Sequence, residues 1–96
     1  MPDINAAMEV IDFYIKYKLD KPDASMKQSF FIYCCQRIEA AELLRKYLIK
    51  HWNEAPAADL VFLFIKDRKR LKNRLKNDVF QKIVYDVAKD IFYYFI

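Results

Sequence analysis

The strongest chemical signal in the sequence is a run of cations between residues 66 and 76. This basic segment holds seven of the chain's 17 Lys and Arg residues but only one of its 13 acidic residues, Asp67. It therefore carries a formal charge of +6, and the rest of the chain carries −2. Positive charge at this density attracts phosphate backbones through counterion release. The predicted nucleic-acid contacts are Lys66, Arg68, Lys69, Arg70, Lys72, Arg74 and Lys76.

The sequence leaves the partner of the basic segment open. Arginine guanidinium groups and lysine ammonium groups bind the phosphates of DNA or RNA, and the same cations would also form ion pairs with an acidic protein. A solvated helix end is the third interpretation, because cations favour the negative end of the helix dipole. Only Leu71 and Leu75 give the segment an apolar face, so no membrane partner is expected.

One pair of residues suggests catalysis. His51 is the sole histidine, and Arg45 precedes it by six positions. This spacing resembles the Arg-x(4–6)-His motif of the HEPN ribonucleases, helical proteins that often dimerise and in which both residues act on the RNA phosphodiester. The residue after the arginine is usually small and polar or a histidine in that family, whereas here it is Lys46. The resemblance implies an RNA-cleaving helical dimer as a third candidate function.

Other chemistry is sparse, so a non-enzymatic protein is expected. The chain has no glycine, which excludes the usual phosphate-binding, dinucleotide-binding and calcium-binding loops. Cys34 and Cys35 are adjacent, point about 100° apart on a helix and have no second ligand pair, so no metal is expected. No cofactor is predicted either.

The elements that position these residues are expected to be helices. Apolar residues recur at steps of three and four, which predicts helices over about 4–19, 25–53, 57–76 and 79–95. We expect one all-α domain over residues 1–96, a three- or four-helix antiparallel bundle. Ser25 and Gln28 have the capping-box spacing at the start of the second helix.

Two features of these helices remain open at the sequence level. The second is long for so small a domain, so either it kinks near Gln36 and Arg37 or a second subunit covers its excess length. The boundary at Asn77 and Asp78 is weak because no Pro or Gly enforces it. One continuous helix from Pro56 to Phe95 is therefore an alternative.

The apolar content predicts both a dense core and a subunit contact. Hydrophobic residues make up 55% of the chain and aromatic residues 17%. Core packing is expected for Phe13, Phe30, Trp52, Phe64 and Phe80. Consecutive apolar residues near the C-terminus point in all directions on a helix, which predicts a homodimer. The expected contacts are Ile83, Val87, Ile91, Phe92, Tyr94 and Phe95.

These observations predict a small helical regulator that binds nucleic acid through the basic segment. The alternative is a protein-interaction module, such as an adaptor, an inhibitor or an antitoxin-like protein, using the aromatic C-terminal helix. The longest apolar runs, residues 60–65 and 91–96, fall far short of the roughly 20 residues that span a bilayer. No secretory signal is recognisable, so a soluble cytoplasmic protein is expected.

Overall fold

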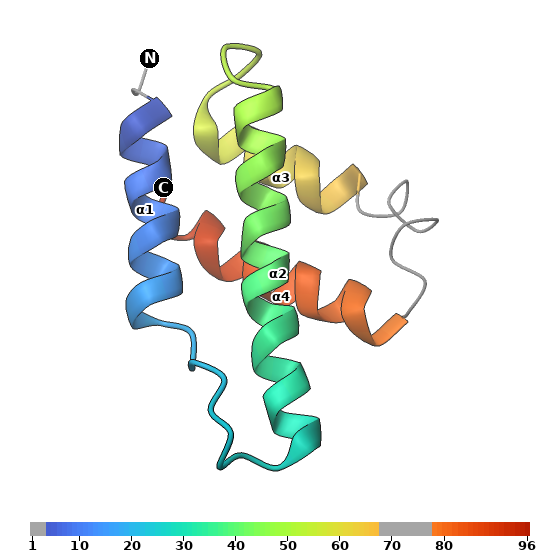
Figure 1. Cartoon of the computed structure of the whole chain (residues 1–96). Coiled ribbons are helices and arrows are strands. Elements are labelled where there is room, and N and C mark those ends of the chain that lie inside the picture. Colours follow the sequence, from blue (N-terminus) through green and yellow to red (C-terminus); the bar gives the residue numbers. More distant parts are fainter. Residues whose placement is uncertain (1–3, 68–77) are drawn as a thin grey trace.

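The computed structural model describes residues 4–67 and 78–96, which form four helices. They are α1 (Ile4–Tyr17), α2 (Gln28–Lys50), α3 (Ala57–Asp67) and α4 (Asp78–Phe92) (Figure 1). No strand occurs in these two ranges. The predicted all-α fold is confirmed. The part of the third predicted helix beyond residue 67 lies outside the described residues.

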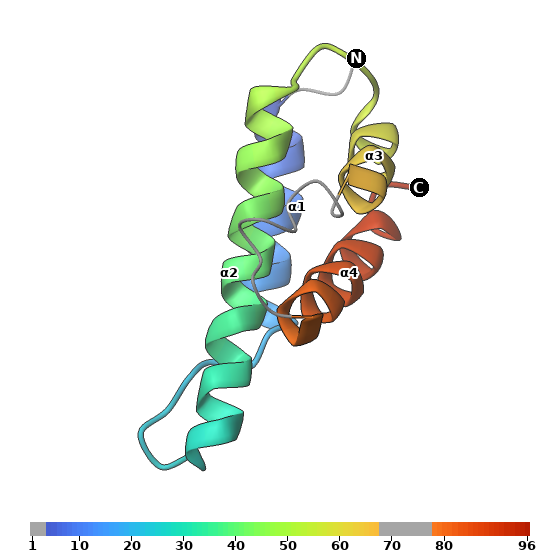
Figure 2. The ribbon, with the colours of Figure 1, turned by 90° about the vertical axis from the view of Figure 1, so that its right-hand side faces the viewer.

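The helices form two antiparallel pairs that cross each other. The first pair is α1 and α2, and the second pair, α3 and α4, runs across it (Figure 1). Viewed from the side, α3 and α4 form a second layer next to α2 (Figure 2). Both α2 and α4 contact all three other helices. Because α3 and α4 run in opposite directions, the alternative of one continuous helix from Pro56 to Phe95 is wrong.

The core lies where these two layers meet. Its fully buried side chains come from all four helices, as expected from apolar residues spaced by three or four. They include Ile11, Tyr14, Leu44, Leu48, Leu60, Val61, Phe64, Val84, Val87 and Ile91. Burying such side chains is the main source of stability in a domain of this size.

Three of the five aromatic residues expected in the core are there. Phe64 and Phe80 are buried, and Trp52 packs against the core. The expectation was wrong for Phe13 and Phe30, which keep 45% and 42% of their surface exposed. Helical spacing placed each in an apolar stripe, but the stripes of α1 and α2 are wider than the faces that the neighbouring helices cover.

The start of α2 differs from the predicted capping box. The helix begins at Gln28, and Lys27 at the N-cap position makes no side-chain capping bond. Instead, the backbone N–H of Ser25 donates to Asp23 Oδ1 at 3.1 Å, and that of Met26 donates to the Asp23 carbonyl at 3.0 Å. Asp23 thus organises a turn ahead of the helix, a local bond that competes with helix capping.

Helix α2 is one continuous element from Gln28 to Lys50, without a break near residues 36 and 37. Its first turns project beyond the ends of the neighbouring helices (Figures 1 and 2). The first buried residue of α2 is Cys34. At the other end, Asn53 adopts a positive φ of 79° and reverses the chain where many proteins use glycine.

Candidate functional site

The basic segment begins at the end of α3. Lys66 is the one predicted nucleic-acid contact within the described residues, where it is exposed in the last turn of α3. Its Nζ lies 5.3 Å from the ring centroid of Phe62, which is also exposed. The other predicted contacts lie outside the described residues: Arg68, Lys69, Arg70, Lys72, Arg74 and Lys76. The end of α3 and the start of α4 lie at the same side of the bundle (Figure 1).

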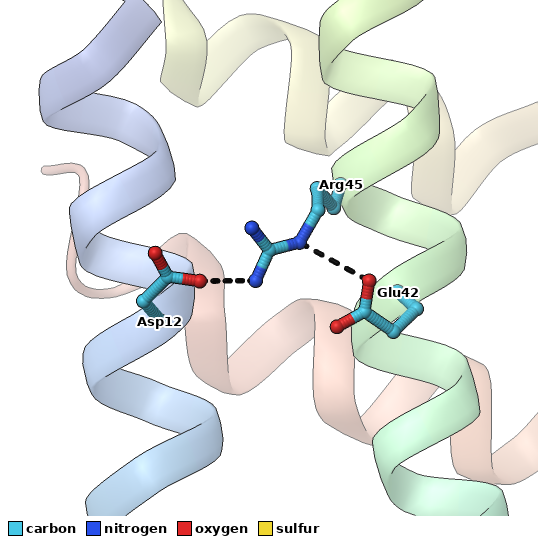
Figure 3. Close-up of polar contacts among 3 residues, drawn as sticks. All are labelled: Asp12, Glu42 and Arg45. Atoms are coloured by element: carbon cyan, nitrogen blue, oxygen red, sulfur yellow. Dashed lines mark hydrogen bonds and ion pairs between the residues drawn. The ribbon is translucent and has the colours of Figure 1, made fainter.

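Arg45 and His51, the pair that resembles a ribonuclease motif, have separate partners in this chain. The Arg45 guanidinium forms ion pairs with Asp12 of α1 and, at 3.2 Å from Nε, with Glu42 of α2 (Figure 3). His51 Nδ1 lies 2.7 Å from Glu54 Oε2.

The ring of His51 also packs at 4.4 Å from Tyr47, which lies 5.2 Å from Phe64 of α3. Arg45 therefore faces α1, whereas His51, directly after α2, packs on Tyr47, whose ring contacts α3. Six residues turn a helix through about 600°, so the two side chains do not converge on one substrate within one chain.

The residues predicted as a dimer contact divide between core and surface. Ile83, Val87 and Ile91 are 5%, 2% and 0% exposed and belong to the core of the same chain. Phe92 and Phe95 are partly buried against that core. Ile83, Val87 and Ile91 therefore pack within their own chain, whereas Phe92 and Phe95 each keep part of their surface open to solvent. Tyr94, at 44% exposed, remains on the surface.

The structure brings together a group of residues that no sequence pattern connects with one another. Tyr14 and Lys18 come from α1 and the turn after it, Arg37 comes from α2, and Asp90 comes from α4. With Tyr93 and Tyr94 they line an open cavity of about 400 Å³. The centre of this group is the Tyr14 hydroxyl, which donates a hydrogen bond to Asp90 Oδ2 at 3.0 Å.

A second cavity of about 330 Å³ adjoins the first, since Arg37 and Asp90 line both. Here Tyr33 and Arg37 of α2 face α4, and the guanidinium carbon of Arg37 lies 5.5 Å from the Tyr33 ring centroid. We call the two cavities together the tyrosine groove. Its polar and aromatic residues are Tyr14, Lys18, Tyr33, Arg37, Asp86, Lys89, Asp90, Tyr93 and Tyr94.

The charges in the groove act on the Tyr14 hydroxyl. Burial raises the pKa of Tyr14 well above its usual value, and the nearby Asp90 carboxylate raises it further. Arg37 acts in the opposite direction, because a cation favours the ionised phenolate. Tyr14 is therefore a protonated hydrogen-bond donor at neutral pH.

Sequence reasoning missed this groove because its members are far apart in the chain. Tyr14 and Asp90, for example, are separated by 76 positions. Near the groove, the sequence does show Phe13 and Tyr17 four residues apart, although neither residue lines it. Their rings are 5.1 Å apart, and Lys16 Nζ lies 5.3 Å from the Tyr17 centroid.

Other kinds of site find no support in the described parts of the chain. Residues 4–67 and 78–96 contain no group of three His, Cys, Asp or Glu side chains placed to hold a metal ion. None of the four helices combines the length and apolarity that a membrane crossing requires. Comparisons with protein-family models, curated proteins and solved structures gave no match to this chain.

Proposed function

We propose that this protein is a small non-enzymatic regulator that binds nucleic acid through the basic segment, residues 66–76. The observation that carries the proposal is the separation of charge along the chain: +6 in these 11 residues and −2 in the remainder. A net charge of +4 spread evenly would attract a polyanion weakly. Concentrated in one segment, the cations release several counterions when they meet a phosphate backbone.

The packing of the helices supports this proposal. The antiparallel pair α3 and α4 presents both of its adjoining ends, Asp67 and Asp78, on the same side of the bundle (Figure 1). Lys66 is exposed in the last turn of α3, so a phosphate group can contact it without any rearrangement of the buried residues.

The test measures binding of a fluorescent oligonucleotide at several salt concentrations. Wild-type affinity should fall steeply with salt, with a log–log slope of roughly −0.7 to −0.9 per phosphate contact. A triple variant, Lys69→Glu, Arg70→Glu and Lys72→Glu, should lose most of the binding.

The matched control carries the same charge change on other elements: Lys16→Glu, Lys46→Glu and Lys50→Glu. All three lysines are exposed, so the control should remain folded by circular dichroism. It should retain more affinity than the triple variant of the basic segment. Equal losses in the two variants, or no binding by the wild type, would overturn the proposal.

A second candidate function, a protein-interaction module, is favoured by the projecting start of α2. Phe30, Phe31, Ile32 and Tyr33 are consecutive, and each keeps between 37% and 46% of its surface exposed. Four consecutive residues cover every side of a helix, so no single neighbouring helix of the same chain could bury them all. A contiguous exposed apolar surface marks a protein contact. We therefore propose a subunit contact here, at α2, in place of the one expected at α4.

A further inference from the structure

Two exposed aromatic rings line the first cavity of the tyrosine groove. Tyr93 and Tyr94, in the turn directly after α4, are 61% and 44% exposed. The ring of Tyr94 is fixed by edge contacts, with its centroid 6.0 Å from Tyr14 and 6.3 Å from Phe13. An aromatic ring that is held in place yet open to solvent is a platform on which a flat, apolar group stacks at little entropic cost.

Cations stand beside these rings. Lys18 and Arg37 line the same cavity as Tyr93 and Tyr94, and Asp90 is the carboxylate among its lining residues. Asp90 Oδ2 already accepts the hydrogen bond of Tyr14. Cations therefore outnumber carboxylates two to one in this cavity. Arg37 offers a planar fork that suits a phosphate, and Lys18 offers a mobile ammonium group.

Stacking rings beside phosphate-binding cations are the combination by which proteins hold single-stranded nucleic acid. In a single strand the faces of the bases are accessible, and one phosphate group links each nucleoside to the next. A duplex stacks those faces inside its helix, so it would meet the cations alone. The cavity of about 400 Å³ lies within the range of small-ligand sites and is open at its surface.

We propose that the tyrosine groove binds single-stranded nucleic acid, with bases stacked on Tyr93 and Tyr94 and phosphates held by Lys18 and Arg37. This inference rests on the proposed nucleic-acid function and adds the form of the strand that is bound. The basic segment supplies attraction that any phosphate backbone would feel, and the groove supplies the preference for unpaired bases.

The first test compares a single strand with a duplex of the same length. Wild-type protein should bind the single strand more tightly. The Tyr93→Ala and Tyr94→Ala double variant should lose roughly tenfold or more in single-strand affinity, because stacking on one ring contributes about 1–3 kcal/mol. Its duplex affinity should not change. Ile49→Ala, which removes an exposed apolar side chain near the other end of α2 and outside the groove, is the control and should bind both forms like the wild type.

The second test separates the position of a cation from its charge. Lys18→Ala and Lys46→Ala each remove one exposed lysine, but only Lys18 lines the groove. Single-strand affinity should fall several-fold for Lys18→Ala and stay near wild type for Lys46→Ala. Equal effects of the two substitutions would overturn the proposal.

The outcomes distinguish the groove from the basic segment. If the glutamate variant of residues 69, 70 and 72 loses binding while the tyrosine variant matches the wild type, the groove proposal fails and the proposed function stands. If the tyrosine variant loses single-strand binding while the glutamate variant does not, the groove stands and the basic segment fails. The groove proposal would also be overturned if the wild type bound single strand and duplex with equal affinity. The same holds if it bound polyglutamate as tightly as a single strand.

Discussion

Tyr14 shows how one residue joins two distant helices. It is 2% exposed on α1, and its hydroxyl reaches across to Asp90 of α4. A buried hydroxyl without a partner would cost roughly 1–3 kcal/mol, so the bond to Asp90 is what makes a tyrosine tolerable at this position. The same bond joins two residues that line the tyrosine groove.

The raised pKa of Tyr14 predicts a loss of stability at alkaline pH. An unfolded tyrosine loses its proton near pH 10, whereas the folded protein holds the Tyr14 proton to higher pH. This stabilisation is therefore complete below about pH 10 and is lost as the pH rises through the folded-state pKa. Urea unfolding at neutral pH and above pH 10 should show a smaller alkaline decline for Tyr14→Phe than for the wild type.

Tyr93→Phe is a suitable control for this experiment, because Tyr93 is exposed on the same groove and lacks the Asp90 bond. Tyr14→Phe should also be less stable than the wild type at neutral pH by about 1 kcal/mol, the usual net value of one hydrogen bond. An alkaline decline equal to that of the wild type would contradict the role given to Tyr14.

At the scale of elements, α2 has two parts with different roles. From Cys34 to Leu48 its buried residues follow one stripe that contacts the other helices: Cys34, Ala40, Ala41, Leu44 and Leu48. Its first turns, before Cys34, have no buried residue and project from the bundle (Figure 2). The same helix thus supports the core at one end and presents apolar surface at the other.

This division predicts unequal costs for similar truncations within α2. Leu44 is fully buried, so Leu44→Ala should lower the free energy of unfolding by about 2–5 kcal/mol. Ile32 keeps 46% of its surface exposed, and alanine favours a helix, so Ile32→Ala should cost less than about 1 kcal/mol. Denaturant unfolding of both variants at low protein concentration measures the difference. Equal costs would mean that the start of α2 is packed in solution.

At the scale of the whole molecule, the exposed residues at the start of α2 determine how the protein should associate. The proposed subunit contact there predicts a dimer at high protein concentration, since burying large apolar side chains stabilises association. Light scattering should show this dimer for the wild type and a monomer for the Phe31→Asp and Ile32→Asp double variant.

Tyr93→Asp tests the competing surface at the end of α4 and should leave the dimer intact. Ile91→Asp would not be informative, because Ile91 is fully buried and the substitution would disrupt the core. A wild-type monomer at all concentrations would contradict the α2 contact. A dimer that only Tyr93→Asp disrupts would show that the subunit contact lies at the C-terminal end of α4 instead.

The sequence by itself determined the helical class and the separation of charge. Residues such as Ile11, Leu44, Leu48, Val84 and Val87 recur at helical spacing, and a 3.6-residue period is a local property that any single segment reveals. The charge of residues 66–76 is likewise a property of composition. For these features, no knowledge of distant contacts was needed.

Only the tertiary structure decided which apolar residues face solvent and which polar residues meet. Phe30 and Leu44 belong to the same helix and the same kind of pattern, yet only Leu44 lies where α2 contacts its neighbours. Tyr14, Arg37 and Asp90 meet because two helical pairs cross, not because of any spacing between them. A periodic pattern defines a face of a helix, but the crossing of helices determines how much of that face is covered and what lies opposite it.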